Sequence, residues 1–260
     1  MKCKEIITII EKDYPGKCAL EWDNTGLLAG RDDKEIRRIY VALDASDEVI
    51  EEAVKQKADL LVTHHPLIFS ELKSVTNQNF TGNRVLKLLQ NDICCYAMHT
   101  NYDVKRMGEL SFRKLGIVKS RVLEVTALGG DEKEEGIGRI ADIEPVTLGE
   151  MCGKVKEAFG LSCVRAWGDL NTHVKRAAIC PGSGKSVIRS ALEKGADVLI
   201  TGDIGHHEGT DAAAQGMAII DAGHYGVEHI FIDDMKKYFE KHIPEAAVLA
   251  ADICHPFSVI

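Results

Sequence analysis

The 260-residue sequence has no excess of basic residues and no long apolar run. It contains 32 Lys and Arg against 40 Asp and Glu, a net charge of −8. A duplex-binding surface needs a basic footprint, so nucleic acid is not an expected partner. No apolar run approaches the roughly 20 residues that span a bilayer, and the acid-containing N-terminus lacks a signal-peptide core. We therefore expect a cytoplasmic protein without a membrane segment.

The cysteines also lack the spacing of a metal or redox motif. None of the eight forms a C-x-x-C pair, and several lie in apolar, strand-like runs. Without a sign of export, the expected state is reduced and mostly buried thiols. The composition is that of an ordinary globular protein, with 45% hydrophobic and 28% charged residues. A chain of this length can form one large domain or two small ones.

An internal repeat is the clearest positive feature of the sequence. Residues 38–63 align with residues 176–201 at one constant offset. Each copy shows a β run, a helical spacing of apolar residues and a second β run, the pattern of a βαβ unit with parallel strands. The identical pairs are Arg38 and Arg176, Val49 and Val187, Ile50 and Ile188, Ala53 and Ala191, Ala58 and Ala196, Asp59 and Asp197, Leu61 and Leu199, and Thr63 and Thr201.

The repeat resumes farther along each half, where residues 90–103 align with residues 215–228. The sequence therefore predicts an α/β fold of two pseudo-symmetric βαβ-containing halves, which usually build a site where they face each other. The expected segments are a first half at 1–125, a connection at 126–170 and a second half at 171–260. For the region between the repeats we expect strands at 121–127, 136–143 and 161–167, an acidic turn at 129–136, and a helix at 145–160 with Thr147 as N-cap.

Two adjacent histidines, His64 and His65, follow the second strand of the first repeat. Ligands bind at the carboxyl ends of parallel strands. Neighbouring side chains of a regular strand point to opposite faces, so the pair can converge only where the strand has ended, and Pro66 favours such an end. An isolated pair of this kind would more often be one structural and one exposed histidine.

A second pattern makes a metal site the better interpretation. His224 and Glu228 are four residues apart, and His99 and Asp103 repeat this spacing at the matching place in the first half. Side chains at i and i+4 of a helix share a face and can bind one cation. Imidazole with carboxylate, without thiolate, suits Fe, Mn, Zn, Co or Ni. Asp103 and Glu228 could bridge two divalent ions per chain, as in two-metal sites; the remaining expected ligands are His64, His65 and His224.

Other polar groups are weaker candidates. Asp203, His206 and His207 follow the second repeat and could transfer protons or support the ligands, although structural hydrogen bonding is as reasonable. The turn of Gly182, Ser183 and Gly184 lacks the first glycine of a P-loop; it could bind an anion, or be only a tight strand-to-helix turn. Trp22 and Asn24 lie in a polar loop that could support the mouth of a cavity or be plain surface. His255 has no partner in the repeat.

The sequence resembles the Nif-three-like dinuclear-metal family, also known as GTP cyclohydrolase 1 type 2 homologues. The resemblance covers nearly the whole chain and implies that His64, His65, Asp103, His224 and Glu228 are the metal ligands, without His99. It also implies a toroidal homohexamer, and the length indicates that the inserted middle domain of longer relatives is absent. The matching segments are WDNTGLLAG, ADLLVTHHPLIF, HTNYD, GIGRI, GSG, ADVLITGDIGHHE and DAGHYGVEH.

These observations favour a metal-dependent hydrolase of a nucleotide or another small molecule, with GTP ring opening as one option. The alternative is a non-catalytic metal-binding or metal-handling scaffold that acts through partners. A nucleotide or sugar-phosphate binding module built on the Gly182 turn is a third hypothesis, and it predicts binding that survives loss of metal. The sequence names neither the substrate nor the native metal.

Overall fold

The computed structural model describes residues 1–130 and 133–260, and the chain divides into two compact units. Unit 1 consists of Met1–Lys105 and Phe231–Ile253, and unit 2 consists of Arg106–Ile230 and Cys254–Ile260. Each unit is a sheet with helices, so the predicted α/β class with βαβ character is confirmed. Residues 131–132, in the expected acidic turn, lie outside the described residues.

The two units are not the same segments as the expected halves. Residues 126–170 belong to unit 2, whereas they were expected to connect the halves. The chain also returns to unit 1 near its end, because residues 231–253 supply a helix and an edge strand to the first sheet. The expected bounds at 1–125, 126–170 and 171–260 stay a prediction about the sequence repeat.

Unit 1 has a five-stranded sheet in the order β1-β4-β3-β2-β11. Strands β11, β2, β3 and β4 are parallel, and β1 pairs antiparallel with β4. The strands are β1 (Gly26–Ala29), β2 (Arg38–Ala42), β3 (Leu60–Thr63), β4 (Cys94–Ala97) and β11 (Ala247–Ala250). The helices are α1 (Cys3–Asp13), η1 (Gly16–Cys18), α2 (Asp47–Lys55), α3 (Phe80–Gln90), α4 (Thr100–Tyr102), the π-helical η2 (Asp103–Met107) and α10 (Ile230–His242).

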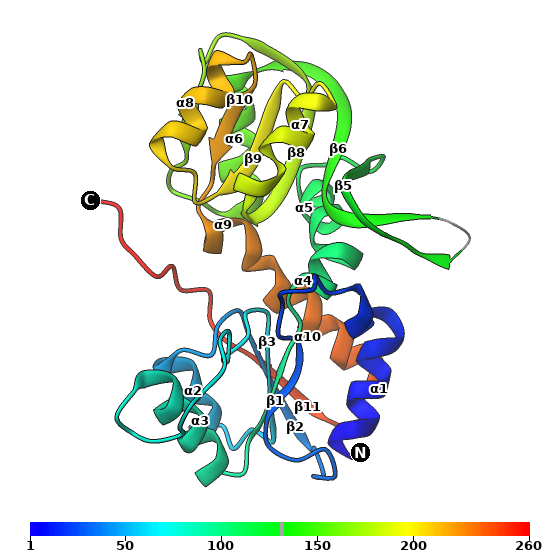
Figure 1. Cartoon of the computed structure of the whole chain (residues 1–260), viewed down its shortest axis with the longest axis vertical. Coiled ribbons are helices and arrows are strands. Elements are labelled where there is room, and N and C mark those ends of the chain that lie inside the picture. Colours follow the sequence, from blue (N-terminus) through cyan, green and yellow to red (C-terminus); the bar gives the residue numbers. More distant parts are fainter. Residues whose placement is uncertain (131–132) are drawn as a thin grey trace. The chain divides into compact units, whose positions relative to one another are not determined.

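Helices cover both faces of the unit 1 sheet, with α2 and α3 on one side and α1 and α10 on the other (Figure 1). On the α2 and α3 side, Ile50 and Leu88 pack with Leu61 and Cys95 of the central strands. Because both faces are covered, β3 and β4 are buried along their whole length. That explains why these strands have continuous apolar runs rather than an alternating pattern.

Unit 2 has a six-stranded sheet in the order β5-β6-β8-β9-β10-β7. Strands β8, β9 and β10 are parallel, and the other pairings are antiparallel. The strands are β5 (Arg121–Leu128), β6 (Glu134–Thr147), β7 (Arg165–Trp167), β8 (His173–Ser183), β9 (Val198–Gly202) and β10 (Ala218–Asp221). The helices are α5 (Gly108–Lys114), α6 (Leu148–Phe159), η4 (Gly184–Val187), α7 (Ile188–Glu193), α8 (His206–Ala214) and α9 (His224–Glu228).

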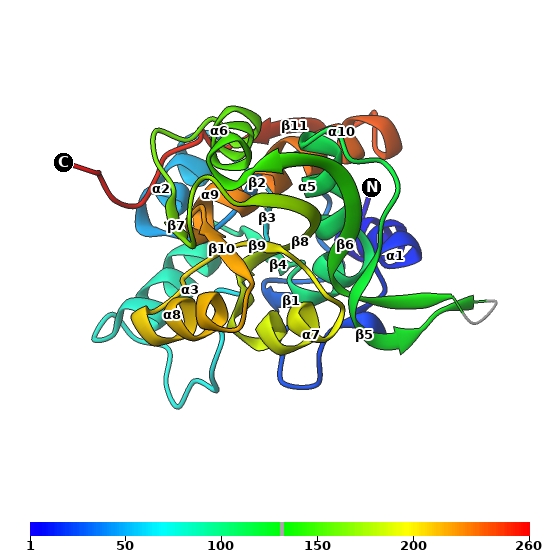
Figure 2. The same cartoon turned by 90° about the horizontal axis from the view of Figure 1, so that it is seen from above.

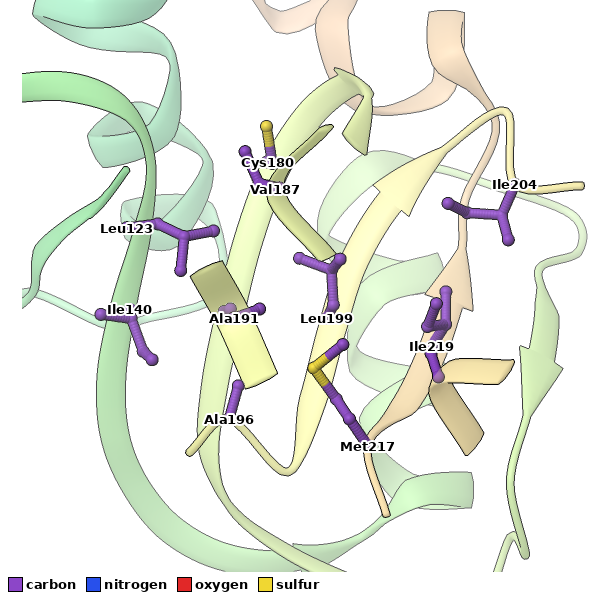
Figure 3. Close-up of a cluster of buried hydrophobic side chains, with 12 residues drawn as sticks. Leu123, Ile140, Cys180, Val187, Ala191, Ala196, Leu199, Ile204, Met217 and Ile219 are labelled. Carbon is purple, nitrogen blue, oxygen red and sulfur yellow. The ribbon is translucent and has the colours of Figure 1, made fainter. Parts of the chain in front are cut away.

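The unit 2 sheet is also covered on two faces: Figure 2 shows α7 and α8 on one face and α6 on the other. Under α7 and α8, buried side chains fill the space between helix and sheet (Figure 3). Ala191 of α7 lies against Leu199 of β9, and Met217 and Ile219 extend the cluster toward α8. The small residue on the helix allows the close helix-to-sheet approach that this packing needs.

The two copies of the sequence repeat have the same local structure in the two units. Asp59 accepts the backbone N–H groups of Arg37 and Arg38, each at 2.9 Å, at the start of β2. Asp197 accepts those of Lys175 and Arg176, each at 2.8 Å, in β8. These aspartates, which are identical in the two copies, satisfy backbone donors beside the strand pairing. The order β1-β4-β3-β2 recurs as β7-β10-β9-β8, so the repeat also includes an antiparallel edge strand.

The second part of the repeat is shifted by one residue in the structure. The sequence alignment pairs Ala97 with Ala222, but the sheets pair Thr63 with Ala97 and Thr201 with Asp221. Gly223, with φ at 75°, takes the N-cap position before α9 that His99 takes before α4. As a result His224 is the first residue of its helix, whereas His99 precedes α4 as its N-cap.

The helix expected at 145–160 begins later. Residues 145–147 belong to β6, and α6 starts at Leu148 because Thr147 caps it. Thr147 Oγ1 accepts Glu150 N–H at 3.1 Å and Glu150 Oε2 accepts Thr147 N–H at 2.8 Å, which confirms the predicted N-cap and its capping box. All eight cysteines are free, six of them buried. Among the described residues no helix combines the length and the apolar character of a membrane span.

Candidate metal centre

In unit 1 the two adjacent histidines follow β3, as predicted. The backbone N–H groups of His64 and His65 both donate to Leu43 O, at 3.1 and 3.0 Å. Thr63 Oγ1 donates to His65 O at 2.8 Å. These bonds turn the chain out of the strand, so both imidazoles can lie on one side. Their ring centroids are 5.0 Å apart.

The Nδ1 atom of each of these rings faces an acceptor. His64 is fully buried, and its Nδ1 lies 2.7 Å from Met98 O. His65 Nδ1 lies 2.7 Å from Asp44 Oδ1. A ring that donates through Nδ1 presents Nε2 as a lone-pair donor, which is the usual arrangement of a metal-binding histidine. The two rings are therefore oriented as ligands rather than only as packing residues.

His99 is held in the same manner by a buried carboxylate. His99 Nδ1 lies 2.8 Å from Asp23 Oδ1, and Asp23 Oδ2 accepts Thr100 N–H and Oγ1–H at 2.9 and 2.5 Å. Desolvation tends to raise the pKa of Asp23, but the hydrogen bonds from His99 and Thr100 outweigh it and lower this pKa from 3.8 to about 2. Asp23 is therefore an anion at neutral pH, and it fixes the orientation of His99.

One nitrogen each of His64, His65 and His99 lies within 4.8 Å of the others, a cluster that could hold a metal ion. Asp103 Oδ1 lies 3.4 Å from His64 Nε2, so a carboxylate borders the cluster. Asp103 begins the π-helical segment η2, and such segments are frequent at functional sites. Unit 1 thus brings four of the predicted site residues together.

Unit 2 holds the other two predicted ligands on α9. His224 Nε2 lies 3.0 Å from Glu228 Oε2, which confirms that the i and i+4 side chains share a face. His224 Nδ1 lies 2.8 Å from Asp203 Oδ2, the relation that His65 has with Asp44. Asp203 has a positive φ of 56°, a conformation that aspartate tolerates better than most residues. Glu228 is only 3% exposed.

Two glycines leave room for these side chains. A Cβ on Gly182 would lie 2.3 Å from Glu228 Oε1, and one on Gly202 would lie 2.5 Å from the backbone nitrogen of His224. Gly182 also has a φ of 75°. Gly182, near the end of β8, therefore makes space for the carboxylate of Glu228, a function that the sequence did not reveal.

The remaining candidates are placed as follows. His206 and His207 are exposed at the start of α8, and no group of three potential ligands in residues 1–130 and 133–260 includes them. Ser183 ends β8, and Gly184 packs against Thr201. In unit 1, Trp22 is 58% exposed and Asn24 Nδ2 donates to Ile68 O at 2.6 Å.

A ligand-sized cavity of about 680 Å³ lies beside Asp203 in unit 2. Arg165 and Asp221, which form an ion pair, line it, and so do His255 and Phe257 from the C-terminal segment. His255, unassigned from the sequence, packs edge-to-face on Tyr225 with ring centroids 5.3 Å apart. The cavity offers both apolar and charged walls next to the His224 and Asp203 pair.

Asp44 and Asp23 were not recognised from the sequence. Asp44 follows β2, at the carboxyl end of a parallel strand, so its position in the repeat was a usable signal. Asp23 lies between two residues that drew attention for other reasons, Trp22 and Asn24. Its pairing with His99 links positions 76 residues apart, and no local pattern predicts such a contact.

Comparisons with known proteins agree with the motifs. The sequence model of the Duf34/NIF3 (NGG1p interacting factor 3) family matches residues 1–255. A Clostridium acetobutylicum protein named GTP cyclohydrolase 1 type 2 homolog is 34% identical over 243 residues, which cover 92% of this chain and 90% of that protein. A Streptococcus pneumoniae protein of the same name is 37% identical over 239 residues, covering 90% and 88%. A solved Bacillus cereus protein related to NIF3 shares the fold, with a TM-score of 0.93, 24% identity, and coverage of 100% of this chain and 99% of that one.

Proposed function

Because the chain belongs to the Duf34/NIF3 family, we propose that it is a metal-dependent hydrolase of a nucleotide or another small molecule. His64, His65, Asp103, His224 and Glu228 would hold two divalent ions, with Fe, Zn, Mn, Ni and Co as the metals that suit such ligands. Asp103 and Glu228 would be the bridging carboxylates.

The observation that carries this proposal is the shared orientation of three histidines. His64, His65 and His224 each have Nδ1 within 2.7–2.8 Å of an oxygen acceptor, so each presents Nε2. A carboxylate oxygen lies close to Nε2 of two of them, at 3.4 Å for His64 and 3.0 Å for His224. Nitrogen and oxygen donors without thiolate match the proposed metals.

Two bound divalent ions would supply an activated water at neutral pH and neutralise charge that develops on the substrate. The protein's part is to hold the ligands in place and to move protons. Asp44 and Asp203 keep His65 and His224 in the ligating tautomer. His99, held by Asp23, is the histidine of the unit 1 cluster outside the proposed ligand set, and it can exchange a proton through Nε2.

A nucleotide is the substrate class that the relatives' names suggest, since the curated relatives are called GTP cyclohydrolase 1 type 2 homologues. The cavity beside Asp203 is within the usual size range of a small-molecule site. Its Arg165 side chain is a donor that could contact a phosphate.

The test combines metal loading with turnover. Protein reconstituted separately with each of the five metals is analysed for bound metal and incubated with a panel of nucleotides and small amides. We expect up to two ions per chain and turnover of at least one substrate, abolished in His64→Ala. The matched control is His173→Ala, a change of an exposed histidine in β8. Metal loading without turnover of any substrate would instead support a metal-handling scaffold.

We further propose a cytoplasmic homohexamer with a toroidal arrangement. Eight free thiols are typical of a reducing compartment. Closed rings of symmetric subunits are common among soluble homo-oligomers, and the family resemblance points to six chains. Sedimentation equilibrium at micromolar concentration tests the assembly, and a monomeric mass contradicts it.

A further inference from the structure

Two large aromatic side chains of unit 1 are exposed next to the histidine cluster. Trp22 is 58% exposed and Phe69 is 62% exposed. Their ring centroids are 5.9 Å apart and the ring planes are tilted by 48°. Apolar surface that stays exposed after folding gives no hydrophobic stabilisation to the fold. Two exposed aromatic rings in contact therefore form an apolar surface that a bound ligand can bury.

The two rings are held by hydrogen bonds of their loops. Asp23, next to Trp22, has a fully buried side chain that binds His99 and Thr100. Asn24 Nδ2 donates to Ile68 O at 2.6 Å, which ties the Trp22 loop to the residue before Phe69. A preorganised aromatic surface loses little conformational entropy on binding.

A series of ring contacts joins Trp22 to the cluster. The centroids of Trp22 and His99 are 5.8 Å apart in an edge arrangement. His99 is in turn 5.6 Å from His65 and 5.2 Å from His64. A molecule that lies on the indole ring of Trp22 is therefore separated by one ring, that of His99, from the imidazoles of His64 and His65, which we propose as ligands.

We propose that Trp22 and Phe69 stack a planar heteroaromatic ring of the substrate beside the His64, His65 and His99 cluster. The proposal rests on the proposed function, because it names the substrate class of the same site. Stacking selects any flat π-system and needs no hydrogen bond to a particular edge, so it favours a nucleobase or a similar heterocycle over a sugar phosphate alone.

The sequence provides a direct probe, since its two tryptophans are Trp22 and Trp167. In Trp167→Phe, Trp22 is the single tryptophan, and its fluorescence is titrated with guanosine and, separately, with ribose 5-phosphate. We expect saturable quenching by guanosine and none by the sugar phosphate. Trp22→Phe, which retains Trp167, should show no quenching, and it serves as the complement should Trp167→Phe fold poorly.

Phe69→Ala should weaken guanosine binding about tenfold, the effect of losing one stacking partner. Phe80→Ala is the matched control. Phe80 is 70% exposed in the same unit, and its ring lies under the guanidinium of Arg84, whereas the ring of Phe69 contacts Trp22. Absence of quenching by guanosine, or equal affinities of Phe69→Ala and Phe80→Ala, overturns the proposal. So does a changed sedimentation mass of Trp22→Ala with unchanged guanosine affinity, which would make the patch a contact between copies of this chain.

These binding measurements separate the two proposals. Quenching without turnover of any substrate supports the stacking surface and contradicts the hydrolase. If the protein turns over substrates that lack a heteroaromatic ring, and Trp22→Ala does not change the KM, the result supports the hydrolase and contradicts the stacking surface.

Discussion

His224 Nδ1 lies 2.8 Å from Oδ2 of Asp203, a residue 21 positions earlier in the chain. His65 Nδ1 lies 2.7 Å from Oδ1 of Asp44, also 21 positions earlier. The two units thus fix one histidine each through a carboxylate that follows a parallel strand. We expect Asp203→Asn and Asp44→Asn to reduce metal affinity about 10–100-fold, because the amide weakens control of the tautomer.

Competition with a chelator of known affinity measures this effect for each variant. Asp211→Asn, a change of an exposed aspartate in α8, is the control and should bind metal like the unchanged protein. Equal affinities of all three variants would mean that these carboxylates do not tune the ligands.

Gly182→Ala tests the space that this glycine of β8 leaves for Glu228. The added Cβ would lie 2.3 Å from Glu228 Oε1, so the carboxylate must move and metal binding should weaken. The positive φ of 75° adds strain of about 1–2 kcal/mol for a residue with a side chain. Gly216→Ala separates the two effects, because Gly216 has a φ of 90° and no atom of the described residues within 4 Å of the Cβ that the substitution adds.

Both glycine variants should lower the free energy of unfolding in urea, Gly182→Ala by more than Gly216→Ala, because it adds the displacement of Glu228 to the backbone strain. Only Gly182→Ala should change the metal content measured by elemental analysis. Normal metal content in Gly182→Ala, with a stable fold, would show that Glu228 tolerates displacement or is not a ligand.

Asp23→Asn should change the acid stability of the metal-free protein. The pKa of Asp23 is lowered from 3.8 to about 2, so the carboxylate stabilises the fold fully above pH 4 and loses this contribution as the pH falls toward 2. The shift corresponds to about 2 kcal/mol at neutral pH. The variant should therefore be less stable at pH 7 and show a smaller loss between pH 4 and pH 2. Urea unfolding at several pH values measures the free energy of unfolding, and Asp33→Asn, a change of an exposed aspartate, is the control. The prediction is contradicted if the free energies of Asp23→Asn and of the unchanged protein depend on pH in the same way.

The sequence was sufficient for the parts of the fold that depend on local patterns. The two βαβ units, the histidines after β3, the Thr147 cap and the shared face of His224 and Glu228 all follow from periodicity, chain breaks and helical spacing. Each of these features is decided within a few residues of the chain. For that reason they were predictable without knowledge of the tertiary structure.

The features that were missed depend on contacts between distant residues. The return of residues 231–253 to the first sheet pairs β11 with β2, strands that are separated by most of the chain. The offset between His99 and His224 appears only in the strand pairing, where Ala97 corresponds to Asp221, one residue before the Ala222 of the sequence alignment. The Asp23 and His99 pair has the same character, since nothing near either residue indicates the other.

The final prediction concerns which residues determine metal stoichiometry. If Asp103 and Glu228 bridge two ions, then removing either should cost both ions, whereas His65→Ala should mainly weaken the binding of one ion.

His99 is the residue on which the sequence repeat and the family resemblance disagree. The repeat pairs it with His224, and its nitrogen lies within 4.8 Å of those of His64 and His65. However, it precedes its helix as the N-cap, while His224 begins one, so the two are not in equivalent positions. We therefore expect His99→Ala to keep two ions. Elemental analysis measures the metal content, and circular dichroism checks the fold, of Asp103→Ala, Glu228→Ala, His65→Ala and His99→Ala. Two tightly bound ions in both carboxylate variants would exclude bridging. A metal loss in His99→Ala as large as in His65→Ala would make His99 a sixth ligand.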